Sequence, residues 1–488
     1  MVYFPSPLRL PMQTASDSVP TLSKFSLSSR GNLAALPHYL LLIAALAVLL
    51  APALWNGYAL IFYDTGGYIE AAREMYLVPG RSLFYGLFLR IASLGWTSLW
   101  GPAVLQAGLS LWLIHLLWRA HRLPSGPAML LPVATVMAAA TSLAWYADQL
   151  MPDIFVPLVV LALWLLSAHG PILSRREKVG LSLLVLLGLL SHMSCLALAL
   201  GLAVVLLVQR LFIASWPLRL RIVLPTMLVV AVLALMPLLH TLLTGHGGFT
   251  PGGSAFLFGR LVQDGVAKRW LQEHCPVPGV RLCAWKDQLP QTADDFLWGM
   301  DSPYKKIGDW QDIQVQREMG QLIREMVRAY PGMILSTGLG STLEQIISVA
   351  TGDDLDAKHW DSRGIISTFL PRISPAFNSA RQQREQITPE LLARWNRLHV
   401  PVALASMLLL LPIARWGLRS NHRPLAGLAL FVLVALLGNA FICGALSNPH
   451  HRYQSRLIWL APLVVVLALG EYFADRRDRS RQLPISAD

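Results

Sequence analysis

Two short polar segments hold the residues best suited to chemistry in an otherwise apolar chain. The first is Tyr63-Asp64-Thr65-Gly66-Gly67, which directly follows a long apolar run. A carboxylate that stands beside a bilayer and is shielded from bulk water can act as a general base. The two glycines would let the backbone come close to a ligand. Asp64 could equally cap the helix expected over 65–75, because Asp is a favoured N-cap residue. The sequence leaves both roles open.

The second segment, Asn448-Pro449-His450-His451-Arg452-Tyr453-Gln454-Ser455-Arg456, is polar and basic between two apolar runs. Arg452 and Arg456 are four residues apart and would share one helix face. A guanidinium binds a phosphate through two parallel hydrogen bonds, so this segment, with His450, is a candidate phosphate site. Alternatively, both arginines could extend to lipid headgroups.

Three further residues are secondary candidates for substrate contacts. Arg81 precedes the aromatic Leu83-Phe84-Tyr85 run, Asp148 lies in a short polar turn, and His192 interrupts an apolar stretch. A single histidine in such a place is more often a hydrogen-bonded core residue than a ligand. No cysteine spacing typical of a metal site occurs.

The composition indicates a membrane protein. Hydrophobic residues make up 54% of the chain and charged residues only 14%, against about 25% charged residues in soluble domains. The apolar residues form runs near the length that a helix needs to cross a bilayer. The formal charge of +12 does not indicate nucleic acid as a partner, because the basic residues fall in short loops, where they orient helices and contact anionic lipid.

The pattern therefore predicts an all-α polytopic membrane protein with about ten transmembrane helices. A tail over 1–36 would precede an N-terminal bundle over 37–241, whose first outer loop covers 56–96. An insert over 242–397, C-terminal helices over 398–474 and a tail over 475–488 would follow. The expected spans are 37–55, 97–118, 126–146, 153–169, 179–190, 193–209, 221–241, 398–416, 424–444 and 456–474.

Basic residues follow every even-numbered span, which places those loops and both termini in the cytoplasm by the positive-inside rule. This alternation requires the apolar stretch 179–209 to divide at Ser191-His192-Met193-Ser194. The insert is then extracytoplasmic and is expected to be mostly helical, with 331–350 apolar enough to lie against the membrane. In an oxidising compartment, the nearby Cys275 and Cys283 are expected to form a disulfide.

This layout resembles the GT-C superfamily of membrane glycosyltransferases. The resemblance rests on the acidic first loop at Tyr63-Asp64-Thr65, the Arg81-Ser82-Leu83-Phe84-Tyr85 segment before the next span, the many spans and the large insert. It implies a polyprenyl-phosphate sugar donor, an envelope glycan or lipid acceptor, and a site on the extracytoplasmic face of a bacterial inner membrane. It also implies that Asp64 is the catalytic residue. The chain departs from the family in having a single acidic residue in that loop. No cofactor is required, although a divalent cation remains possible.

Two other classes of protein would use the same residues differently. A transporter or flippase for a lipid-linked or amphipathic solute would line its path with these polar side chains, but they cluster toward one face. A structural component of an envelope assembly would account for the insert, but not for Asp and Arg beside the membrane.

Overall fold

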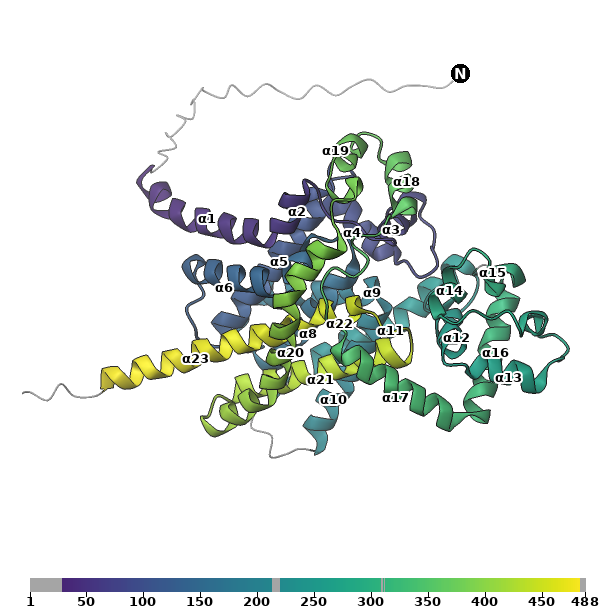
Figure 1. The fold of residues 1–488 in the computed structure, drawn as a ribbon. Helices are drawn as coiled ribbons and strands as arrows, with labels where there is room; N and C mark the ends of the chain where they lie inside the picture. The colour runs from purple at the N-terminus through teal and green to yellow at the C-terminus, as the bar shows by residue number, and fades with distance from the viewer. Residues whose placement is uncertain (1–28, 213–219, 309, 311, 483–488) are drawn as a thin grey trace, which may run out of the picture.

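The computed structural model describes residues 29–212, 220–308, 310 and 312–482, and throughout them the secondary structure is helical (Figure 1). No β-strand forms among these residues; two isolated bridges occur, of which one joins Leu60 to Gln149. The predicted all-α class is therefore confirmed. The N-terminal part contains α1 Ser29–Leu49, α2 Ala51–Asn56, α3 Thr65–Glu74, α4 Leu83–Ala92, α5 Trp100–Ala120, α6 Pro127–Ala140, α7 Leu143–Asp148, η1 Pro152–Ile154, α8 Phe155–Ala168, α9 Arg175–Ser191, α10 Met193–Phe212 and α11 Val223–Thr244.

The remaining helices follow α11 in two groups. The middle of the chain holds α12 Gly253–Gln263, α13 Val266–His274, η2 Arg281–Trp285, α14 Ala293–Trp298, α15 Pro303–Ile307, α16 Ile313–Ala329, α17 Pro331–Ile347, α18 Trp360–Phe369, α19 Ser374–Asn378 and η3 Gln382–Arg384. The C-terminal group is α20 Pro389–Arg419, α21 Arg423–Ala445, α22 His451–Ile458 and α23 Leu460–Gln482. Most of the expected N-terminal tail and the end of the C-terminal tail lie outside the described residues.

Six helical segments in the described part of the chain are long and apolar enough to cross a membrane, which marks the chain as a membrane protein. They are Trp100–Ala120, Met193–Leu211, Val223–Thr244, Pro389–Arg419, Arg423–Ala445 and His451–Asp478. The other predicted spans coincide with shorter helices. Leu36–Leu49, Pro127–Ala140 and Pro152–Ala168 are apolar but short, and α9 begins with a charged turn. A count of ten spans therefore stays a prediction.

The predicted division of 179–209 is present. Helix α9 ends at Ser191, His192 has an extended backbone, and α10 begins at Met193. A helix cannot continue through an extended residue, so the apolar stretch forms two segments that pack against each other.

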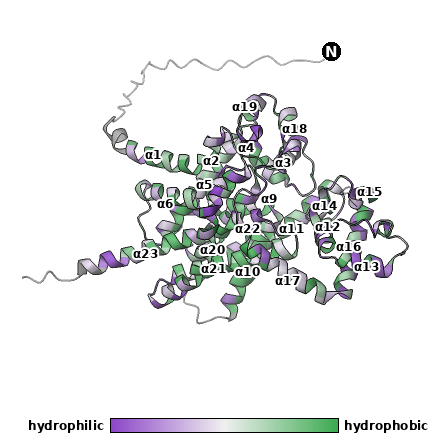
Figure 2. Ribbon diagram, in the orientation of Figure 1, coloured by the Kyte–Doolittle hydropathy of each residue, from purple (hydrophilic) through white to green (hydrophobic). Residues whose placement is uncertain are grey.

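One large apolar core joins the bundle helices. Helix α8 lies at its centre, and nearly every side chain from Phe155 to Ser167 is buried. Trp164 packs on Phe431 of α21, with ring centroids 5.4 Å apart. Figure 2 shows that α10, α20 and α21 are predominantly hydrophobic.

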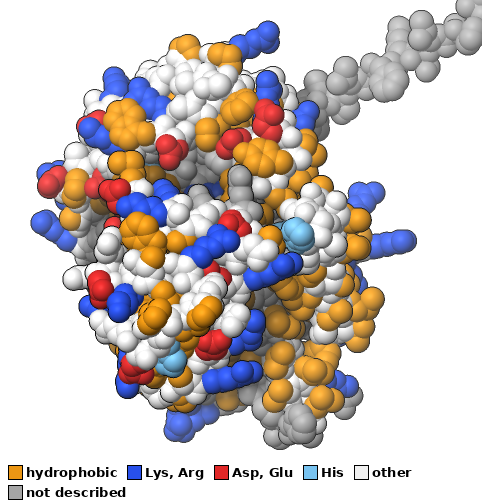
Figure 3. All heavy atoms as spheres, turned by 90° about the vertical axis from the view of Figure 1, so that its right-hand side faces the viewer, with side chains coloured by type: hydrophobic (Ala, Val, Ile, Leu, Met, Phe, Trp, Pro, Cys, Tyr) orange, Lys and Arg blue, Asp and Glu red, His pale blue; other side chains and the backbone are white. Residues whose placement is uncertain are grey.

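Residues 253–330 enclose a second apolar core of their own. On α16 the buried residues Val315, Met319, Leu322 and Met326 form one face, and charged residues occupy much of the rest. The face of the molecule that includes this region mixes acidic, basic and apolar side chains (Figure 3), as water-exposed surfaces usually do.

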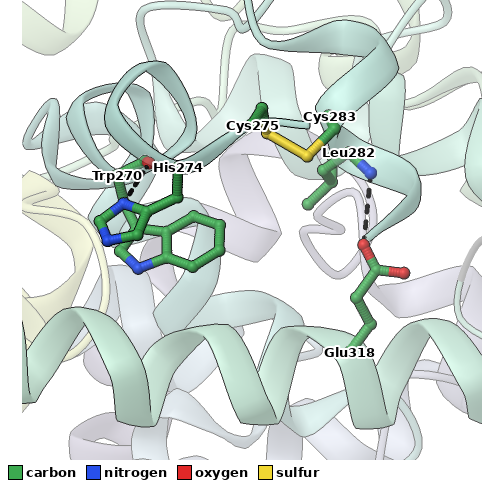
Figure 4. The surroundings of a disulfide bond; sticks show 6 residues. All are labelled: Trp270, His274, Cys275, Leu282, Cys283 and Glu318. Carbon is green, nitrogen blue, oxygen red and sulfur yellow. Dashed lines mark hydrogen bonds between the residues drawn. A yellow bond between two sulfur atoms is a disulfide. The ribbon is translucent and has the colours of Figure 1, made fainter. Parts of the chain in front are cut away.

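The predicted disulfide between Cys275 and Cys283 is confirmed, with an S–S distance of 2.09 Å. It closes a short loop after α13, and next to it the backbone N–H of Leu282 donates to Glu318 of α16 over 3.2 Å (Figure 4). The disulfide and this hydrogen bond attach the loop to the second core.

Residues 331–397 pack against the bundle. Helix α17 lies along α21, and α18 lies against α3. A small third apolar cluster joins Leu60 and Trp145 to Leu355, Ile387 and Leu392. These contacts bring the middle of the chain over the first loop, beside Asp64.

Candidate functional site

Asp64 occupies the N-cap position of α3, but its side chain makes no capping hydrogen bond. The turn is held by other groups. The Thr65 hydroxyl accepts from the Phe62 N–H over 2.8 Å and donates to the Leu150 carbonyl over 3.0 Å. The Asp64 carboxylate instead forms an ion pair with Arg81. Of the two roles that the sequence left open, the capping role is therefore absent.

The two glycines after Asp64 serve close packing within the protein. A Cβ on Gly66 would lie 2.6 Å from the Ser362 Cα, and one on Gly67 would lie 3.0 Å from the Arg81 Cγ. The Gly66 N–H also donates to the Ser362 hydroxyl over 2.8 Å. Gly66 and Gly67 therefore let α18 and Arg81 approach the Asp64 turn.

Arg81 is held on both sides of its guanidinium. One side pairs with Asp64, and the Cζ atom lies 5.0 Å from the ring centroid of Trp298 on α14. Its Nη1 also donates to the Pro79 carbonyl over 3.1 Å. The side chains of Arg81 and Asp64 are 18% and 20% exposed, so this pair is shielded but still reachable.

Arg452 approaches the same carboxylate from α22. Its Nη1 lies 4.0 Å from Asp64 Oδ2, and its Cζ lies 4.3 Å from the ring centroid of Phe62. The Arg452 backbone N–H donates to Asp353 over 3.0 Å. Its Nη1 is buried and makes no hydrogen bond within the described structure. Asp64 thus lies between two guanidinium groups, and one of these has an unused donor.

Arg456 shares the helix face of Arg452 but has a different environment. Its Nη1 lies 2.9 Å from Asp153 and 3.0 Å from the Nε2 of His192, and its Nη2 donates to Ser194 over 2.8 Å. The side chains of Arg456 and Asp153 are 0% and 2% exposed. Arg456 and His192, both predicted substrate contacts, therefore form a buried group that joins α22 to α10 and η1.

His450 lies at the rim of the Asp64 site. Its Nε2 is 3.2 Å from Asp294 of α14, and its Nδ1 is 3.9 Å from Asp353. Gln345 of α17 fixes its backbone by accepting from the His450 N–H and donating to the His450 carbonyl. The hydrogen bond from His450 holds the pKa of Asp294 below its usual range.

Asp148 lies apart from the other candidates. It is fully buried, and its Oδ2 accepts from the Ala53 N–H over 2.7 Å. Its carbonyl accepts from the Leu60 N–H over 3.0 Å. These bonds connect α2 and α7 and support the strand-like start of the first loop. The structure gives Asp148 a packing position without access to the Asp64 site.

Residues 353–359, which include acidic side chains and His359, lie against the other side of the Asp64 turn. Burial and the neighbouring Asp353 raise the pKa of Asp354. Burial lowers the pKa of His359 to about 4, and its ring lies 4.7 Å from that of Tyr63. No group of three or more His, Cys, Asp or Glu side chains in the described part of the chain is arranged to hold a metal ion.

Sequence reasoning missed Asp294, Trp298 and Asp353 as parts of this site. The acidic runs Asp294-Asp295 and Asp353-Asp354 were visible in a chain with few charged residues. No sequence signal showed that α14 would reach both Arg81 and His450, because those contacts depend on how residues 253–330 pack on the bundle.

The chain matches no protein-family model, no curated protein and no solved structure in the comparisons made. The site holds the partly exposed Asp64 carboxylate between two guanidiniums, with an aromatic ring beside each guanidinium. This arrangement can bind an anionic group through the arginines and take a proton at the carboxylate.

Proposed function

We propose that the protein is a membrane glycosyltransferase, which moves a sugar from a polyprenyl-phosphate donor to an envelope acceptor on the extracytoplasmic face of a bacterial inner membrane. The observation that carries this proposal is the position of Asp64 between Arg81 and Arg452, partly exposed at the edge of an apolar bundle. A lipid phosphate would reach such a site from the bilayer, and a hydrophilic acceptor would reach it from water.

In the proposed reaction, the donor phosphate takes the place of the Asp64 carboxylate as the partner of the two arginines. The bond between the sugar C1 and the phosphate oxygen breaks, and the phosphate leaves with the electron pair. The acceptor hydroxyl oxygen bonds to C1 and passes its proton to Asp64. Arg81 and Arg452 stabilise the charge that grows on the phosphate, which is where fixed donors lower a barrier most.

Other residues would support this reaction without touching the substrate. The Arg456 group with Asp153 and His192 fixes α22, and so fixes Arg452 one turn away. The Gln345 and Asp353 bonds hold the segment over 450–452. Precise placement of charged groups accounts for much of the rate that such sites achieve.

The direct test is transfer by the purified protein in lipid vesicles. The vesicles would carry a radiolabelled pool of polyprenyl-phosphate sugars together with a membrane extract as acceptor. Glycosylated product that depends on the protein is the expected result. Movement of the labelled lipid between leaflets, with no product, would instead identify a flippase.

A further inference from the structure

Helix α17 has a reversed distribution of polar and apolar side chains. Its buried residues include Gly338, Ser341 and Gln345. Its exposed side chains include Leu335 (74%), Leu339 (60%), Leu343 (58%) and Ile347 (63%), which recur every fourth residue on one face. A helix at a water-exposed surface does the opposite and buries its leucines.

The polar face of α17 is used inside the protein. The Thr337 hydroxyl donates to Asp264 over 3.0 Å, and Ser341 accepts from Arg260 of α12. Gln345 bonds both backbone groups of His450. Thr337, Ser341 and Gln345 therefore each have a partner, which is what a helix surrounded by hydrocarbon requires of its polar groups, and Glu344 is the exposed charged residue of this helix.

Close helix contact explains the small residues on the inner side of α17. A Cβ on Gly444 of α21 would lie 2.5 Å from the Ser341 carbonyl oxygen, and one on Gly338 would lie 3.4 Å from the Ala445 Cβ. Small residues that bring two backbones together are typical of helix pairs in membranes. Helix α21 is one of the six segments apolar enough to cross a membrane. The outer face of α17 therefore continues the surface of a membrane helix.

The exposed face of α17 fits lipid better than a protein partner. Its four large side chains are all aliphatic, whereas the energetically dominant residues of protein interfaces are mostly Trp, Tyr and Arg. We propose that α17 is immersed in the bilayer and that Leu335, Leu339, Leu343 and Ile347 contact lipid acyl chains. Its 17 residues fall short of the roughly 20 that a span needs, so α17 enters the membrane without crossing it.

This immersion would anchor residues 253–330 to the bilayer from their C-terminal side. It would also fix the depth of His450 relative to the membrane, because Gln345 of α17 hydrogen-bonds the His450 backbone. The inference does not depend on the proposed reaction, since it concerns only what surrounds α17.

The test is site-directed spin labelling in lipid nanodiscs. Nitroxides would be placed at Leu339→Cys and Leu343→Cys, with Leu408→Cys on α20 as a lipid-facing control and Arg324→Cys on α16 as a water-facing control. The two free cysteines, Cys195 and Cys443, are buried, so the added surface cysteines can be labelled selectively. Collision rates with oxygen and with a water-soluble nickel chelate would be compared.

Both α17 labels are expected to behave like the label at position 408. They should collide readily with oxygen and collide with the nickel chelate several-fold less than the label at position 324. Nickel collisions at the level of position 324 would show that α17 faces water and would overturn the inference. Low collision rates with both reagents would show that a protein covers the exposed face of α17, and this result would also overturn the inference. Two label positions guard against a local distortion at either one.

Discussion

Arg452 and Arg456 lie one turn apart on α22, yet their carboxylate partners place them in different surroundings. Arg456 is fully buried with Asp153, and its Nη atoms also contact His192, Ser194 and Asn439. Arg452 is partly exposed and faces a partly exposed Asp64 across 4.0 Å. Arg456 therefore belongs to a buried ion pair that holds the helix, whereas Arg452 is the arginine that we propose binds the donor phosphate.

The largest effect on stability is expected from Asp153→Asn. It leaves the Arg456 charge buried without a counter-charge, and breaking a buried pair in this way costs about 3–5 kcal/mol. The midpoint of thermal unfolding in micelles, followed by circular dichroism, should fall clearly. The double variant Asp153→Leu with Arg456→Met should regain much of this loss, because no buried charge remains. An unchanged midpoint in Asp153→Asn would contradict the structural role of this pair.

Arg452→Lys should reduce transfer without lowering the unfolding midpoint. Lysine keeps the positive charge but loses the planar pair of donors that a phosphate accepts. Losing one such charge-assisted bond, worth roughly 1.5–3 kcal/mol, should lower kcat/KM for the donor by about one to two orders of magnitude. The matched variant Arg456→Lys should mainly lower the midpoint. Equal kinetic effects from both lysine variants would remove the distinction between the two arginines.

A smaller effect is expected when Trp298 is replaced. Its ring lies against Arg81, and a cation–π contact at a partly exposed site is worth about 0.5–1 kcal/mol. Trp298→Ala should therefore lower kcat/KM by about two- to five-fold, and Trp298→Phe, which retains a ring face, should recover most of the activity. If Trp298→Phe is as slow as Trp298→Ala, the ring does not act through Arg81.

The smallest effect concerns acid pH at the contact between α14 and His450. The pKa of Asp294 is lowered in the folded protein, so its ionised form contributes stability above the unfolded pKa. That contribution disappears as pH falls through the lower folded value, below about pH 4. The difference in thermal unfolding midpoint between the parent and Asp294→Asn should therefore shrink as the pH falls below the folded pKa of Asp294. Asp301→Asn, which removes the same charge from an exposed position, serves as the control.

The sequence predicted the helical class and the disulfide, which depend on local pattern and short spacing, and it predicted the break at His192 from the alternation of basic loops along the chain. It also selected Asp64, Arg81, His450 and Arg452, which the structure brings to one place. It could not distinguish Arg452 from Arg456, since helical spacing gives both the same face. Their difference comes from Asp153, which lies about three hundred residues away in the chain. The contacts of α14 with Arg81 and His450 could not be predicted either, because they also join residues that lie far apart in the chain.

The short predicted spans illustrate a further limit of sequence reasoning. An apolar run shows that a segment avoids water, but it does not show whether neighbouring helices or lipid cover it. Helix α8 is apolar because it lies at the centre of the bundle. Helix α17, with buried Ser341 and Gln345, looks only moderately apolar and yet exposes four large aliphatic side chains.

The most direct test of the proposed function is the activity of Asp64→Asn per correctly inserted molecule. Asparagine retains the size of Asp64 and some hydrogen bonding but cannot take the acceptor proton. Transfer should fall by roughly two to four orders of magnitude, the usual contribution of a general base, while the exposed Asp361→Asn on the neighbouring α18 should retain parental activity. The free energy of unfolding should fall less for Asp64→Asn than for Asp153→Asn, because the Asp64 ion pair is partly exposed whereas the Asp153 pair is fully buried. Near-parental transfer by Asp64→Asn would contradict the catalytic assignment of Asp64.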